Sequence, residues 1–264
     1  MEWILVNRER VYGYVSPANP CHKVKMLKGQ NISGYPIGIL YIEDVWYPMI
    51  PGNIVNGYTF DFPVRLKAVE GLDVTRLFRA EKDILEDIIK AGRELEKEGV
   101  RAISAACGFF GNFQKELAES LNVPVGLSSL IQIPWISTII KPSQKIGVLT
   151  ADKSSLTEKL LKNCGAVDME QLIIKDMRHE AEFSCILEGR GEFDNSIVER
   201  EILSKVSEIM EENLNIGAIL LECSDMPPYA AAIQKKSGLP VFDFTTLIKW
   251  LHSSVTQRPY DGFI

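Results

Sequence analysis

The chain has 264 residues, a formal net charge of −6 and a hydrophobic fraction of 46%, the composition of a globular protein with a large core. The acidic balance argues against nucleic acid or an anionic membrane as the main partner, and no apolar run reaches the roughly 18 residues of a transmembrane helix. The chain starts with an apolar patch followed by charge, the wrong order for a signal peptide, and its five cysteines are an odd number. We therefore expect free thiols and a cytoplasmic location.

Apolar runs alternate with amphipathic stretches from residue 35 onward, after an irregular lead-in at 1–34. The clearest helix of the first half is at 76–99, because its apolar residues recur at helical spacing: Ile84, Ile88, Ala91 and Leu95. A long connection at 43–60 carries Pro, Gly and aromatic residues, and long ordered loops are often functional. In this half we predict strands at 35–42, 62–71, 100–106 and 123–129 and helices at 76–99 and 112–121.

After the turn-rich segment 141–144 the same alternation starts again. We predict strands at 145–151, 171–176, 216–222 and 239–244, and helices at 152–165, 195–215, 227–238 and 245–255. Strands and helices that alternate in this way are typical of an α/β fold with mainly parallel sheets.

Short sequence matches indicate that the two halves repeat one structural unit. The tetrapeptide IGIL at 37–40 returns as IGVL at 146–149, an offset of 109 residues, and Cys107 and Cys223 are 116 residues apart. Each cysteine is followed 17 positions later by a Pro-Val pair. We therefore expect two pseudo-symmetric α/β domains, 35–140 and 141–264, with the C-terminal helix as a candidate to pack on the first.

Each of these two cysteines follows a predicted parallel strand and precedes a helix. Open α/β sheets bind ligands at the carboxyl ends of their strands, so two facing units bring Cys107 and Cys223 to opposite sides of one cleft. A helix N-terminus favours the thiolate and offers N–H groups to a carboxylate. One thiolate that removes a proton beside a carboxylate, and one thiol that returns a proton to the other face, would invert that carbon without a metal or organic cofactor.

The paired strand–cysteine–helix units, the IGIL and IGVL strands and the segment LLECSDMPPYA at 220–230 resemble the aspartate/glutamate racemase superfamily, which includes hydantoin racemases and arylmalonate decarboxylase. The segment 50–66 is similar to the loop and second strand of hydantoin-racemase-like members. The resemblance implies that Cys107 and Cys223 are the two catalytic bases. It also implies that Gly108 and Ser224, the next residues, help to hold the substrate carboxylate.

The sequence departs from the superfamily's pattern after the first cysteine. Amino-acid racemases of this group usually have Asn-Thr there, whereas here Gly108, Phe109 and Phe110 follow. A cavity edged by phenylalanine would suit a less polar substrate than aspartate. Ser224 keeps a hydroxyl after the second cysteine.

The main hypothesis is a cofactor-independent racemase or epimerase of a small amino-acid-like or hydantoin-like carboxylate, and by resemblance a homodimer. One alternative is a decarboxylase or cis–trans isomerase that uses mainly Cys223, because the decarboxylase of the superfamily retains only the second cysteine. The presence of both cysteines here favours racemisation. The other alternative is a protein that binds a small carboxylate without turnover.

Further residues are candidates on weaker grounds. Asp225 is a plausible helix cap beside the second cysteine, and Asn56 lies in the long connection. Ser128 and Thr150 each follow a predicted strand and would either bind substrate or cap a helix. Aromatic residues with either a pocket or a packing role are Trp46, Tyr47 and Trp135.

The remaining cysteines and the histidines show no pattern of a reactive site. We interpret Cys21, Cys164 and Cys185 as structural, with Cys164 late in a helix and Cys185 in a strand. The three histidines, His22, His179 and His252, lack metal-ligand spacing, so we expect no metal site.

Overall fold

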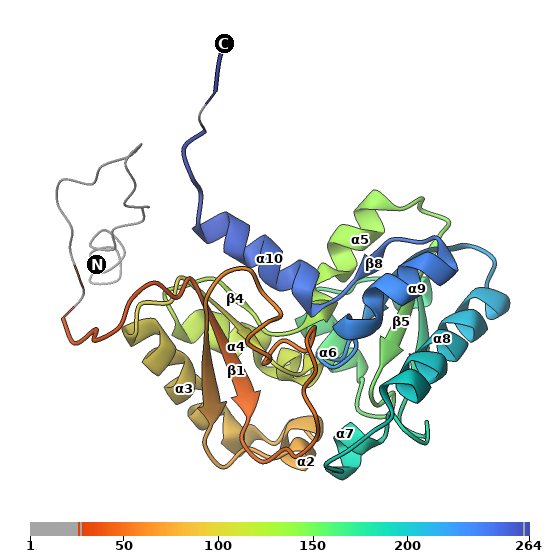
Figure 1. The fold of residues 1–264 in the computed structure, drawn as a ribbon, viewed down its shortest axis with the longest axis horizontal. Coiled ribbons are helices and arrows are strands. Elements are labelled where there is room, and N and C mark those ends of the chain that lie inside the picture. The colour runs from red at the N-terminus through yellow and green to blue at the C-terminus, as the bar shows by residue number, and fades with distance from the viewer. Residues whose placement is uncertain (1–25, 27, 261) are drawn as a thin grey trace.

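The computed structural model describes residues 26, 28–260 and 262–264. Most of the lead-in predicted at 1–34, with Cys21 and His22, lies outside the described residues. The described chain contains two four-stranded parallel sheets, ordered β2-β1-β3-β4 and β6-β5-β7-β8. The two halves lie beside each other, with α10 above the first half (Figure 1). This confirms the predicted α/β fold of two pseudo-symmetric, mainly parallel units.

The first half contains four strands: β1 (Ile37–Ile42), β2 (Val64–Val69), β3 (Ala102–Ala105) and β4 (Val125–Gly126). Its α-helices are α2 (Val74–Phe78), α3 (Leu85–Lys97), α4 (Gln114–Ser120) and α5 (Ile133–Ile139). Its short 3₁₀ helices are η1 (Lys82–Ile84), η2 (Gly108–Phe113) and η3 (Ser129–Gln132).

The second half repeats this order with β5 (Lys145–Thr150), β6 (Leu172–Asp176), β7 (Ile216–Leu221) and β8 (Val241–Phe242). Its α-helices are α6 (Glu158–Asn163), α7 (Cys185–Glu188), α8 (Asn195–Glu212), α9 (Ala230–Ser237) and α10 (Phe244–Val255). Its 3₁₀ helices are η4 (Met169–Gln171) and η5 (Pro227–Tyr229).

Strand registers show that the sequence repeat is a structural repeat. Ile37 pairs with Ala102 between β1 and β3, and Ile146 pairs with Ala218 between β5 and β7. These pairs differ by the 109 and 116 residues that separate the sequence matches. The two halves therefore place corresponding residues at corresponding points of their sheets.

The first sheet is buried on both faces, as expected for a parallel sheet. Leu40 and Ile42 of β1 belong to the core that includes α3, while Ile37 and Ile39 belong to the core that includes α10. The C-terminal helix α10 thus packs on the first sheet, although it follows the last strand of the second.

The helix predicted at 76–99 is broken in the structure. Asp73 caps α2, the chain turns at Ala80 with φ of 50°, and α3 starts only at Leu85. Leu77 lies seven residues before Ile84, so the apolar stripe continues across the break, and no Gly or Pro marks it. The four stripe residues of the prediction are buried, which confirms the face of the helix.

Cys185 was expected in a strand, and this expectation is wrong, because it begins α7. Its short apolar run is compatible with either element, since periodicity does not separate a short strand from a short helix. Cys164 is the C-cap of α6 and is buried, as expected.

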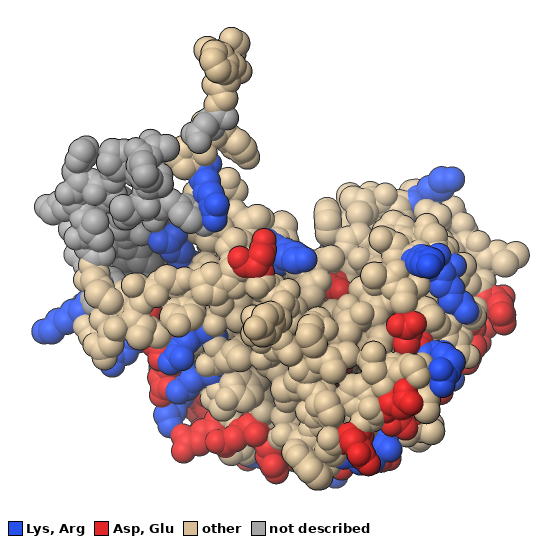
Figure 2. Space-filling view, viewed as in Figure 1, with Lys and Arg blue, Asp and Glu red and all other residues tan. Residues whose placement is uncertain are grey.

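Charged side chains on the face shown in Figure 2 gather over the outer flanks of the two halves, and the middle of this face carries few. Within the described part of the chain, no helix has both the length and the apolarity needed to cross a membrane.

Candidate active site

The two cysteines occupy equivalent positions just beyond β3 and β7. Before each cysteine, a backbone N–H donates to the neighbouring strand: Ala106 to the Leu40 carbonyl at 2.7 Å, and Glu222 to the Leu149 carbonyl at 2.8 Å. The Cys107 sulfur accepts from the N–H of Phe109, two residues on. The Cys223 sulfur accepts from the N–H of Asp225 in the same way.

Both cysteines border one small cavity between the two halves. The carboxyl ends of the strands lie at its edge, where α/β sheets bind ligands. Cys107 is half-buried and Cys223 is buried. Apolar side chains make up most of the cavity wall: Ile42, Val45, Val74, Phe78, Ile186 and Leu187.

The polar groups of the cavity come mainly from the second half. Glu222, Ser224 and Asp225 surround Cys223, whereas the corresponding positions around Cys107 hold Ala106, Gly108 and Phe109. The repeat is therefore symmetric in backbone and asymmetric in chemistry. The two thiols do not have equivalent surroundings.

Asp225 is the polar partner of Cys223. The Cys223 Sγ donates to Asp225 Oδ2 at 3.4 Å, and the Tyr47 hydroxyl donates to the same oxygen at 3.3 Å. The Asn53 side-chain amide donates to the other carboxylate oxygen. Tyr47 and Asn53 both belong to the connection between β1 and β2, so this loop of the first half completes the surroundings of Cys223.

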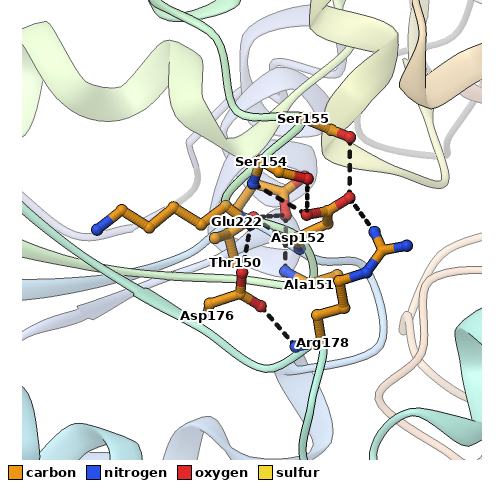
Figure 3. A network of polar contacts seen from close by, with 9 residues as sticks. Thr150, Ala151, Asp152, Ser154, Ser155, Asp176, Arg178 and Glu222 are labelled. Carbon is orange, nitrogen blue, oxygen red and sulfur yellow. Dashed lines mark hydrogen bonds and ion pairs between the residues drawn. The ribbon is translucent and has the colours of Figure 1, made fainter.

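Glu222 is a fully buried carboxyl group, immediately before Cys223. Its Oε2 accepts from the Thr150 hydroxyl at 2.8 Å and from the Ala151 N–H at 3.3 Å, as Figure 3 shows. Its Oε1 has no hydrogen-bond partner among the described residues. Figure 3 also shows Asp152, which is bound by Ser154, Ser155 and Arg178 and fixes the loop after β5.

The expectation of a lowered thiol pKa is wrong for both cysteines. Burial raises the pKa of both Cys107 and Cys223 well above 9, and the neighbouring carboxyl groups raise it further. The N–H bond to each sulfur opposes this shift but is too weak to reverse it. Burial also raises the pKa of Glu222 to about 7 and that of Asp225 to about 6.

The structure brings only some of the predicted substrate-binding residues to the cavity. Phe109, Ser224 and Asp225 border it, and Phe109 also packs against Phe78 with 4.1 Å between ring centroids. Gly108 lies beside Glu222, whose Oε1 would be 1.9 Å from a Cβ at this position. Tyr47, for which the sequence left a pocket or a packing role, also borders the cavity.

The other three predicted residues do not border the cavity and have structural partners instead. Ser128 caps η3 by accepting from the Leu130 N–H, which is the cap alternative of the prediction. Thr150 holds Glu222. Asn56 is internal to its loop, where it donates to the Met49 carbonyl at 2.7 Å.

Sequence reasoning missed Glu222 and Asn53. Glu222 had a signal, because it is an acid that ends an otherwise apolar strand directly before a cysteine. Asn53 had no signal that separated it from Asn56, three residues later in the same loop.

Solved structures share this fold. Unliganded arylmalonate decarboxylase is 14% identical with a TM-score of 0.53, covering 85% of this chain and 93% of that one. A glutamate racemase isoform from Bacillus anthracis is 14% identical with a TM-score of 0.54, covering 84% of each chain. The fold implied by the resemblance to the aspartate/glutamate racemase superfamily is thereby confirmed.

Comparison with curated sequences identifies the family of the chain. It is 30% identical over 224 residues to a dimethylsulfoniopropionate lyase of Durusdinium sp. clade D, covering 82% of this chain and 73% of the relative. It is 30% identical over 239 residues to dimethylsulfoniopropionate lyase 7 of Emiliania huxleyi (strain CCMP1516), covering 86% and 70%. No family model matches the chain. The protein belongs to the family of these dimethylsulfoniopropionate lyases, which confirms an enzyme but not the isomerase class.

Proposed function

We propose that this protein is a lyase that eliminates a dialkyl sulfide from a sulfonium carboxylate such as dimethylsulfoniopropionate, with Cys223 as the base. The observation that carries this proposal is the asymmetry of the thiol pair. Cys223 has a carboxylate partner in Asp225 at 3.4 Å, whereas apolar Phe109 stands at the equivalent position beside Cys107. An elimination needs one base, and the relatives named above are lyases.

The reaction is a β-elimination. The Cys223 thiolate removes a proton from the carbon next to the carboxylate, and the electron pair of that C–H bond forms the carbon–carbon double bond. The bond between the β-carbon and sulfur breaks, and its electrons leave with the sulfur as a neutral sulfide. Dimethylsulfoniopropionate would give acrylate and dimethyl sulfide, with the removed proton on Cys223. Because the leaving group departs neutral, it needs no general acid.

Asp225 supports the base in this scheme. The thiol proton passes to the Asp225 carboxylate along the hydrogen bond between them, and Tyr47 and Asn53 hold that carboxylate in place. Burial holds the pKa of Cys223 high. A bound cation favours the thiolate and lowers this pKa, since an opposite charge nearby stabilises the charged form. Proton removal would thus be coupled to the binding of a cationic substrate.

The test is dimethyl sulfide release from dimethylsulfoniopropionate, followed by gas chromatography of the headspace and by acrylate signals in NMR. We expect Cys223→Ser to lower kcat by about 10²- to 10⁴-fold, the usual contribution of a general base. Cys107→Ser should cost less, because it changes the cavity wall and not the base. Absence of dimethyl sulfide with the wild-type protein would contradict the proposal.

A racemase or epimerase is the second candidate, because both thiols border one cavity. A racemase predicts equal losses of kcat in Cys223→Ser and Cys107→Ser. It also predicts that an amino acid or hydantoin takes up deuterium from the solvent with no other change in its mass. The lyase proposal predicts unequal losses and two products from one substrate.

A further inference from the structure

Glu222 is a titratable group that the elimination itself does not use. It is fully buried and it borders the cavity that contains both thiols. Its Oε2 is bound by Thr150 and Ala151, but its Oε1 has no partner among the described residues. A buried carboxylate oxygen without a partner costs free energy, so this oxygen is where a ligand would lower the energy of the site.

The Glu222 carboxyl group lies in the space that a side chain at residue 108 of the first half would occupy. A Cβ at residue 108 would lie 1.9 Å from Glu222 Oε1 and 2.7 Å from the Glu222 carbonyl oxygen, so only glycine fits there. The resemblance implies that residue 108 helps to hold the substrate carboxylate. In this structure the Glu222 carboxyl group of the second half fills the volume of a side chain at that position. The residue that corresponds to Glu222 in the first half is Ala106, so the acid stands on one side only.

The cavity offers no protein cation to balance this acid. Among the described residues that border it there is no Lys, Arg or His, while Glu222 and Asp225 are both present. Two carboxyl groups in an apolar cavity disfavour an anion beside them and favour a cation. Among the described residues that border the cavity, no side chain supplies a positive charge, so a cationic ligand would balance the ionised form of Glu222.

The wall of the cavity also indicates the kind of cation. An ammonium group with N–H bonds needs several acceptors, whereas the wall here is mostly apolar and aromatic, with Phe78 and Phe109 in contact with each other. A methylated onium group has no N–H to satisfy, packs its methyl groups on apolar walls and is attracted to ring faces. A sulfonium or quaternary ammonium group matches these conditions.

We infer that Glu222 is the counter-ion of the substrate's onium group and selects a cationic sulfonium over a neutral group of the same shape. The inference rests on the proposed function for its substrate class, but it concerns binding and not turnover. Glu222 is here a binding residue: it faces the leaving group, while Cys223 and Asp225 handle the proton.

Two non-reacting carboxylates of similar size test the inference by calorimetry. The probe 3-(trimethylammonio)propionate carries the onium charge, and 4-methylpentanoate has the shape of dimethylsulfoniopropionate with an uncharged CH group in place of the sulfonium. We expect the wild-type protein to bind the onium probe at least about tenfold more tightly, as one uncompensated buried charge requires. Glu222→Gln should lose this preference and still bind 4-methylpentanoate.

A second variant keeps the test valid if Glu222→Gln does not fold. Thr150→Val removes the hydroxyl that holds Glu222 and keeps the carboxyl group, so its preference for the onium probe should fall only in part. Equal binding of the two probes by the wild type, or an unchanged preference in Glu222→Gln, would overturn the inference. Because these are binding measurements, an onium preference without dimethyl sulfide release would refute the lyase proposal alone, and release without the preference would refute the role of Glu222 alone.

Discussion

At the scale of single residues, the chemistry of this site depends on acids that are removed from water. Glu222 and Asp225 are both buried, and burial raises the pKa of each. Hydrogen bonds from Thr150 and Ala151 to Glu222, and from Tyr47 and Asn53 to Asp225, oppose this shift without cancelling it. Both carboxyl groups therefore keep their protons to a higher pH than carboxyl groups in water do.

The raised pKa of Glu222 makes the stability of the protein depend on pH. The pKa of Glu222 is about 7 in the folded protein, whereas a glutamate in water has a pKa of 4.5. The folded state therefore holds this proton more tightly than the unfolded state does. Stability from this group is present below about pH 4.5 and is lost as the pH rises through about 7. Relative to Glu222→Gln, the wild type should lose up to about 3 kcal/mol between pH 4.5 and 8, from the size of the shift. Urea unfolding of both proteins across this pH range measures it, and parallel curves would contradict it.

At the scale of elements, the connection between β1 and β2 matters most, because it joins one half to the site of the other. It brings Tyr47 and Asn53 to Asp225. At Gly52 the backbone has φ of 104°, and a Cβ there would lie 2.7 Å from the Pro228 Cα. Glycine allows both the left-handed conformation and the close approach to the start of η5.

Gly52→Ala should therefore displace the loop from Asp225. We expect a loss of about 1–3 kcal/mol in the free energy of unfolding, the usual cost of backbone strain at such a position, together with a decrease in the proposed lyase activity. Thermal unfolding and dimethyl sulfide release measure the two effects. Gly57→Ala is the matched control, because a Cβ at Gly57 meets no atom within 4 Å. Equal effects of the two substitutions would show that the approach to Pro228 is unimportant.

At the scale of the whole molecule, the halves are tied together by segments that cross between them. The helix α10 follows the last strand of the second half and packs on the first sheet. The Ser129 hydroxyl of the first half donates to the Leu221 carbonyl at the end of β7, at 2.8 Å. Such links keep the two cysteines on one cavity, so the site depends on the packing of both halves.

Leu247 of α10 tests this link. It is fully buried in the core on the first sheet, whereas Trp250 of the same helix is 62% exposed. We expect Leu247→Ala to lower the free energy of unfolding by about 2–5 kcal/mol, and Trp250→Ala to change it by about 0.5 kcal/mol or less. Chemical denaturation followed by circular dichroism measures both. A similar, small effect of the two substitutions would mean that α10 contributes little to holding the first sheet.

Local patterns of the sequence determined the two repeated units, the α/β class and the place of each cysteine at a strand end. They suffice because strand and helix periodicity, and the spacing between equivalent residues, are properties of short stretches. The same reasoning failed at Ala80, where the chain leaves a helix although the apolar stripe continues.

Only the tertiary structure decided what surrounds the cysteines. Glu222 and Gly108 share one volume although they are far apart in the chain, and Asn53 rather than Asn56 reaches Asp225. It also reversed the expected shift of the thiol pKa, because desolvation depends on everything that packs around a group and outweighs the local effect of a helix start. Burial and contacts across the two halves are non-local, and they make two thiols in equivalent backbone positions chemically different.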